Sequence, residues 1–263
     1  MTVPIFSKTL RDQRWALVLW SLGIGALLLV MAALWPTVRD LIDADLLAAL
    51  PEALVELFDI DDMVTGVGFL NTEVFSILMP GLFIAYGVGR GAHAIAGEEQ
   101  DGTLEVVLVS RLSRSRIALE KAAALAVSLT VLGAVVFAFT LLASSLADMG
   151  IPASYAANGA LAMMLIGLQH GALAFAVGAA SGRRGLAVGV AATVAVMGYV
   201  LHVAGVLVDG LEAWQPLSPF TQAIAAGPLS DTVPLGFAWL ALAAVVFVVA
   251  ALPRFTRRDA AAS

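Results

Sequence analysis

Six long runs of apolar residues constrain this 263-residue chain more than any other feature. Each is close to the roughly 20 residues that an α-helix needs to cross the hydrocarbon core of a bilayer. The runs are continuously apolar rather than alternating, which indicates helices and not the strands of a membrane barrel. The sequence therefore predicts an all-α membrane protein, a six-helix bundle in one domain, residues 1–263. The expected spans are residues 15–35, 69–89, 117–143, 156–180, 186–208 and 235–252.

The composition agrees with a protein that lies in lipid. Hydrophobic residues make up 60% of the chain and charged residues 13%, against about 45–50% and about 25% in soluble domains. There is no cysteine, which excludes disulfides, thiolate metal ligands and cysteine nucleophiles. Three scattered histidines do not have the spacing of metal ligands, so we expect no metal. The net charge of −6 argues against a nucleic-acid partner.

The distribution of charge predicts the orientation of the chain. Lysine and arginine precede the first run, and they also occupy the second-to-third connection, the fourth-to-fifth connection and the tail after the sixth run. The intervening segments are acidic, and Arg39 is the exception among them. An excess of basic residues marks cytoplasmic loops, so both termini are expected in the cytoplasm.

Three further segments have expected structures. Residues 1–14 alternate apolar and basic positions, which is typical either of a short amphipathic helix on the inner membrane surface or of a solvated lead-in. The apolar run that follows is longer than the core of a secretory signal, so we expect an uncleaved first span. Pro51 divides the outer segment 36–68 into two short helices, which either cover the bundle mouth or form a solvated cap. The proline-rich segment 209–234 is expected to be a partly re-entrant pair of short helices.

The cytoplasmic connection between the second and third runs carries a compact acidic element. Gly97 is expected to end a helical extension of the second span. Asp101 or Thr103 would then cap a short helix over about residues 103–110, and Ser113 would cap the third span. Such a helix, lying across the inner ends of two spans, would offer a docking surface to a soluble partner. The element comprises Gly97, Glu98, Glu99, Gln100, Asp101, Gly102, Thr103, Leu104 and Glu105.

The string GEEQDGTLEVVLVSRLSRSRIALEK, residues 97–121, resembles the signature of ABC-2 type permeases, the membrane subunits of one class of ABC transporters. That signature is Gly-Glu-Glu-x-x-Gly-Thr-Leu-Glu, followed by Leu-Leu, a proline, a Ser-Arg pair and a lysine that opens the third span. Arg111 stands where the family has its proline, and residues 217–220 resemble a second family string before the last span. The matching residues are Gly97, Glu98, Glu99, Gly102, Thr103, Leu104, Glu105, Val107, Leu108, Ser113, Arg114 and Lys121.

The resemblance implies a half-size permease subunit of an exporter in the bacterial plasma membrane. It further implies that ATP and magnesium bind to a separate ATP-binding subunit, and that this chain binds no cofactor. The chain itself contains no Gly-x4-Gly-Lys-Ser/Thr phosphate loop. It should pair with a second copy of itself or with a sister permease. The expected ATPase-docking residues are Gly97, Glu98, Glu99, Asp101, Gly102, Thr103, Leu104 and Glu105.

A few polar residues lie within the apolar runs. Gln169 and His170 fall in the fourth run and Glu73 near the outer end of the second. They either line a translocation path or take part in helix packing, and His170 is then a neutral side chain hydrogen-bonded to another helix. Glu120 and Lys121 are expected to pair or to reach the membrane surface. A small-residue stripe suited to close helix packing comprises Gly167, Gly171, Ala174 and Gly178.

Three alternative functions remain open at the level of sequence. A stand-alone secondary transporter usually carries broken helices and charged groups at the membrane midplane, and here only Gln169 and His170 lie at that depth. A membrane-embedded enzyme would need a reactive constellation, which the sequence does not assemble. A subunit that only anchors other proteins has no distinguishing sequence signal.

Overall fold

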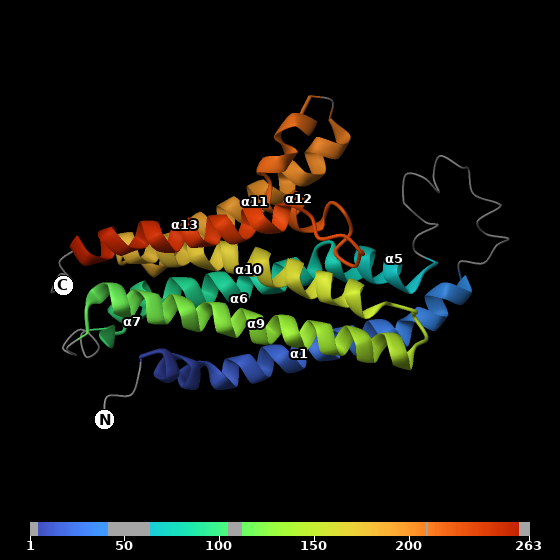
Figure 1. Ribbon diagram of the computed structural model, residues 1–263, viewed down its shortest axis with the longest axis horizontal. Helices are drawn as coiled ribbons and strands as arrows, with labels where there is room; N and C mark the ends of the chain where they lie inside the picture. Colours follow the sequence, from blue (N-terminus) through green and yellow to red (C-terminus); the bar gives the residue numbers. More distant parts are fainter. Residues whose placement is uncertain (1–4, 42–63, 105–111, 209, 258–263) are drawn as a thin grey trace.

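The computed structural model describes residues 5–41, 64–104, 112–208 and 210–257, and within these ranges all regular structure is helical. Figure 1 shows long helices running side by side along the longest axis of the molecule. The expected all-α membrane bundle is confirmed.

Five of the helices are long and apolar enough to cross a bilayer. They are α1 (Ile5–Leu41), α9 (Arg114–Leu146), α10 (Ala153–Ser181), α11 (Arg184–Leu207) and α13 (Gly236–Arg257). α1, α9 and α10 each contain an expected span, and α11 and α13 cover all but one terminal residue of theirs.

The second expected span is broken rather than continuous. It consists of α5 (Gly66–Leu70), the π-helix η1 (Asn71–Phe75) and α6 (Leu78–Ala92), and the chain then continues through the π-helix η2 (His93–Gly97) into α7 (Glu98–Gln100). The two halves meet at an angle of 42°. Counted as one span, this bent pair makes six.

α1 differs from what the sequence indicated. Residues 5–14 are not a separate surface helix but the first turns of a 37-residue helix that also contains the first span. At 1.5 Å per residue such a helix is about 55 Å long, well beyond the roughly 30 Å hydrocarbon core. No glycine or proline stands between Ile5 and Trp15 to end the helix. The amide of Phe6 also donates to Glu120 on α9 at 3.1 Å, which ties this extension to the bundle.

Close backbone contact joins α6 and α10 at the centre of the bundle. A Cβ atom added to Gly87 would overlap the carbonyl oxygen of Gly167, and one added to Gly91 would overlap that of Gly171. Glycines four residues apart on both helices therefore allow the backbones to approach directly. The small-residue stripe expected on the fourth span is confirmed as a packing surface, and its partner is a matching glycine pair on α6.

The segment before the last span contains the expected pair of short helices, η3 (Glu212–Leu217) and α12 (Pro219–Ile224). In Figure 1 the end of α11 and η3 stand out from the side of the bundle, and α12 returns toward α13. Ser218 caps α12 by accepting from Phe220 and Thr221, and its hydroxyl donates to the carbonyl of Gly198 on α11 at 2.7 Å.

Two asparagines hold the chain between α12 and α13 against the bundle. The side chain of Asn71 accepts from the amide of Leu229 at 2.9 Å and donates to its carbonyl at 3.3 Å. Asn158 on α10 donates to the carbonyl of Ser230 at 2.7 Å and to that of Thr232 at 3.3 Å. The expected helices around Pro51 lie outside the described residues.

The beginning of α1, the end of α13 and α7 lie at the same end of the bundle in Figure 1. This agrees with an even number of spans. The basic connections gather at this end, so the charge distribution predicts that it faces the cytoplasm. We call it the inner end, and the opposite end, where the asparagine-held segment lies, the outer end.

Candidate functional site at the inner end of the bundle

The acidic element continues directly from the helix of the second span. The sequence predicted that Gly97 ends the helix, and this prediction is wrong. Gly97 lies within the helix, as the last residue of η2. The π-turn brings its Cα against the imidazole of His93, where a Cβ would overlap the ring. Gly97 is therefore required for close packing rather than for chain reversal.

The helix ends five residues later, at Gly102. This glycine has a φ of 70°, the left-handed conformation that other residues adopt at a cost. The amide of Thr103 donates to the carbonyl of Glu98 at 2.9 Å, and that of Gly102 donates to Glu99 at 3.2 Å. This pattern is a Schellman motif, which satisfies the last carbonyls of a helix. It places residues 101–103 on a tight turn at the inner end.

Glu98 is held by an ion pair with Lys121 of α9. Only 1% of the Lys121 side chain and 20% of the Glu98 side chain is exposed. The expectation that Lys121 pairs with Glu120 or reaches the membrane surface is therefore wrong, because adjacent residues on a helix point to different faces. The pair fastens the acidic element to the start of the third span.

Leu104 is buried and holds the element from its other side. It packs in a hydrophobic cluster to which η2, α9, α10 and α13 all contribute. Burial of Leu104 in this cluster therefore attaches the end of the element to the bundle. This inner cluster comprises Ala94, Ile95, Leu104, Ala118, Phe175, Ala179, Ala251 and Phe255.

The expected docking residues divide into two groups. Gly97 and Leu104 are buried and Glu98 is ion-paired, so these residues anchor the element. Asp101, Gly102 and Thr103 are exposed, as is Gln100 between them and the anchors, whereas Glu99 is partly buried. Glu105 and most of the expected helix over residues 103–110 lie outside the described residues.

The start of α9 is capped as expected. Ser113 accepts from the amide of Arg116 at 3.3 Å. Arg116 in turn pairs with Glu120 one turn later at 2.9 Å, and Glu120 also accepts from the amide of Phe6. The inner ends of α1 and α9 are therefore joined through one carboxylate.

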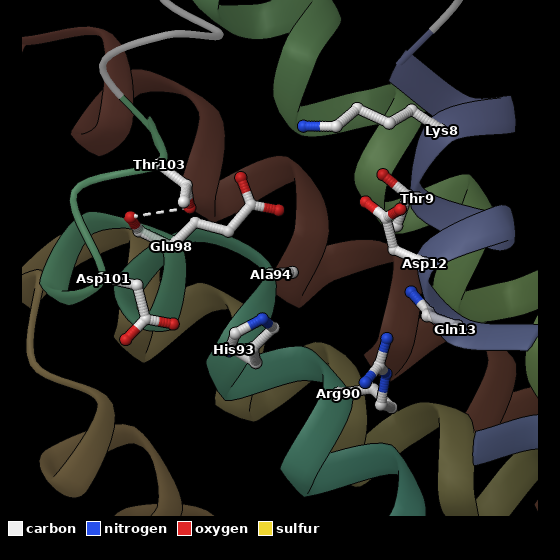
Figure 2. Close-up of a pocket in the computed structure, with 10 residues that line it drawn as sticks. All are labelled: Lys8, Thr9, Asp12, Gln13, Arg90, His93, Ala94, Glu98, Asp101 and Thr103. Carbon is white, nitrogen blue, oxygen red and sulfur yellow. Dashed lines mark hydrogen bonds between the residues drawn. The ribbon is translucent and has the colours of Figure 1, made fainter. Parts of the chain in front are cut away.

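A polar cavity of about 220 Å³ separates the acidic element from α1. Figure 2 shows Lys8, Thr9, Asp12 and Gln13 of α1 on one side, with Glu98, Asp101 and Thr103 across from them. Arg90, His93 and Ala94 complete the wall. Charged groups of both signs face this space, and no group of three potential metal ligands occurs in the described part of the chain.

The polar residues of the spans lie apart from this element. His170 is fully buried, with Nδ1 2.8 Å from the carbonyl of Ile166 on its own helix rather than on another, and its ring packs edge-on against Phe220 of α12. Nε2 of His170 and Oε1 of the neighbouring Gln169 have no hydrogen-bond partner within the described ranges. Glu73 is exposed in η1, beyond the bend toward the outer end.

Sequence reasoning did not identify Lys8, Asp12 and Arg90 as neighbours of the acidic element. These residues come from segments about 80 positions apart that only the fold brings together. Lys121, a cation inside an expected span, was a sequence signal for a different contact, its ion pair with Glu98, because a buried cation needs a partner.

The sequence was compared with families and with curated proteins. Residues 6–256 match the family described as multidrug efflux system permease Rv1217c, C-terminal domain. No individual curated protein matches the chain. The match extends over all six spans and the inner acidic element, so the chain belongs to the family of the multidrug efflux system permease Rv1217c, C-terminal domain.

Proposed function

We propose that this chain is the membrane subunit of an ATP-driven exporter of the ABC-2 type, and that residues 97–110 couple it to a separate ATP-binding subunit. Membership of an efflux permease family supports a transport role. The ABC-2 assignment rests on the resemblance of residues 97–121 to the signature of that class. ATP and magnesium would bind to the partner subunit, and this chain would bind neither.

The observation that carries the proposal is that some residues of the acidic element attach it to the bundle while others are exposed. Glu98 and Leu104 attach it to α9 and to the inner cluster, while Asp101, Gly102 and Thr103 face outward at the inner end. A partner that binds the exposed turn would therefore push on an element that is firmly attached to several spans. This is the mechanical arrangement that coupling between nucleotide turnover and a membrane bundle requires.

The family description supports a second permease unit. It names the C-terminal domain of a permease, so the matched region of that protein is part of a larger one. In the proposed transporter, this chain pairs either with a copy of itself or with another permease half. The cargo would be moved outward across the bacterial plasma membrane, and multidrug efflux points to amphiphilic compounds.

The test is a charge reversal in the exposed turn. Asp101→Lys should abolish binding of the cognate ATP-binding subunit to the reconstituted permease, because it places a cation where the partner meets an anion. The matched control is Glu212→Lys, which makes the same change at an exposed position of η3 toward the outer end. Binding is measured by co-purification in detergent, and coupling by ATPase activity stimulated in proteoliposomes.

The results of this binding experiment distinguish docking at the acidic element from the alternatives. Loss of binding in Asp101→Lys alone, with unchanged thermal unfolding, supports docking at this element. Equal binding by both variants and the native chain would refute it. Substrate transport by the purified permease without any ATP-binding subunit would instead favour the secondary-transporter alternative.

A further inference from the structure

Two spaces of different chemistry lie along the seam between α1 and the second span. The first is the polar cavity at the inner end. The Glu98–Lys121 pair is internally neutral, and the remaining charged side chains at the cavity are Lys8 and Arg90 against Asp12 and Asp101. Among the described residues Lys8 and Asp12 form no ion pair, and Nε of Arg90 is buried without a hydrogen-bond partner. The cavity thus offers separate positive and negative groups in balance.

The second space is an apolar groove of about 380 Å³ between the same two helices. Its walls are Leu19, Trp20, Gly23, Ile24 and Leu27 of α1 and Leu82 of α6. A Cβ at Gly23 would meet nothing within 4 Å, so the absence of a side chain there helps to open the groove. Leu19 is 68% exposed, and the groove therefore communicates with the surrounding lipid.

The two spaces are stacked along one helical face. Thr9 and Asp12 in the cavity share that face of α1 with Trp20, Gly23 and Leu27 in the groove, because these positions are three, four or eight residues apart. Between the two spaces, Trp20 packs edge-on against Tyr86 of α6 at 5.6 Å between ring centroids. The charged space and the apolar space therefore lie in line along α1, with this aromatic pair between them.

The depth of each space matches one part of a phospholipid. The cavity residues of α1 lie just before the first span at residue 15, and Arg90 and His93 lie just after the second span at residue 89. The charged cavity is therefore at headgroup depth on the cytoplasmic side. The groove residues lie within the spans, at the depth of the acyl chains.

We propose that this seam binds a zwitterionic phospholipid of the inner leaflet. The phosphate lies between Lys8 and Arg90, which supply charge-assisted hydrogen bonds. The ammonium group lies near Asp12 and Asp101, and one acyl chain runs along the groove over Gly23. The equal numbers of positive and negative groups select a zwitterion over an anionic lipid. A soluble protein segment could reach the cavity but not the groove.

The experiment uses the purified full-length chain in detergent and native mass spectrometry. Phosphatidylethanolamine and phosphatidylglycerol with identical acyl chains are added in separate titrations. The native chain should retain phosphatidylethanolamine more tightly. Gly23→Leu fills the groove and should weaken binding by about tenfold, because each methylene that loses its apolar contacts reduces affinity several-fold. The matched control is Gly189→Leu on α11, where a Cβ also meets nothing within 4 Å.

A second variant tests the headgroup site independently of the groove. Lys8→Gln combined with Asp12→Asn should abolish the preference between the two lipids while leaving weak binding through the groove. Equal affinity of the native chain for both lipids would overturn the proposal. So would unchanged lipid binding in Gly23→Leu, or a cavity variant that affects only the ATP-binding partner. Asp101 belongs to both proposed sites, so the groove variant separates the two proposals. Gly23→Leu should weaken lipid binding and leave docking of the ATP-binding subunit unchanged.

Discussion

Lys121 shows at the scale of one residue how the inner acidic element is held. Its ammonium group is almost completely shielded from solvent, and Glu98 is its ion-pair partner. Attraction within a shielded pair is strong, but so is the desolvation of both charges. The pair is therefore better understood as a constraint on where the element sits than as a large source of net stability. Removing only one partner should have a much larger effect than removing both.

Glu98→Gln is expected to lower the thermal stability of the permease markedly, because it leaves the Lys121 charge shielded and uncompensated. Breaking such a pair costs on the order of 3–5 kcal/mol, and the partial exposure of Glu98 favours the lower end. The double variant Glu98→Gln with Lys121→Met should recover most of the loss. Arg116→Gln, in the more exposed Arg116–Glu120 pair, is the control and should cost less than about 1 kcal/mol. Tryptophan fluorescence during heating measures all three, and equal losses would contradict this account.

At the scale of helices, the glycine contact between α6 and α10 sets the spacing of the bundle core. Gly87 and Gly91 face Gly167 and Gly171, and no side chain separates the two backbones. In lipid, association of helices depends on such close packing more than on the hydrophobic effect. The broken second span is thus firmly attached to α10 along its inner half. Its outer half lies beyond the 42° bend.

Gly87→Ala is expected to destabilise the bundle by about 1–3 kcal/mol, because the added methyl group forces the two helices apart. Gly81→Ala, on the same helix, is the matched control, since a Cβ there meets nothing within 4 Å. This control should be neutral or slightly stabilising, because alanine favours helix formation. Thermal unfolding of both variants in the same detergent measures the difference. Similar behaviour of the two variants would show that the contact is not tight in the membrane.

At the scale of the whole molecule, the charge distribution predicts that the chain crosses the bilayer with both ends on the cytoplasmic side. The natural absence of cysteine makes this arrangement directly testable, since any label reports only an introduced thiol. Thr103→Cys and Asp231→Cys place single thiols at exposed positions near opposite ends of the bundle. A membrane-impermeant maleimide should label Thr103→Cys only in inside-out vesicles and Asp231→Cys only in right-side-out vesicles. Labelling of both from the same face would refute the topology.

Much of this architecture could be predicted from the sequence, and the rest depended on tertiary contacts. Continuous apolar runs are a strong signal for spanning helices, and Ser113 is a local capping signal that needs no knowledge of the fold. The role of Gly97 could not be predicted, because it follows from a π-turn and from contact with His93. The partner of Lys121 and the neighbours of Arg90 come from segments far apart in the chain. The docking role of residues 97–105 stays a prediction.

The inner cluster and the asparagine-held outer segment have α13 in common. Ala251 and Phe255, near its end, pack with Leu104, and its first residue, Gly236, follows the stretch that Asn71 and Asn158 bind. This single helix of 22 residues, about 33 Å long, thus runs from the cluster that holds the acidic element at the inner end to the asparagine-held segment at the outer end. A small tilt imposed on its inner end would therefore be transmitted along one rigid helix to the outer end of the bundle.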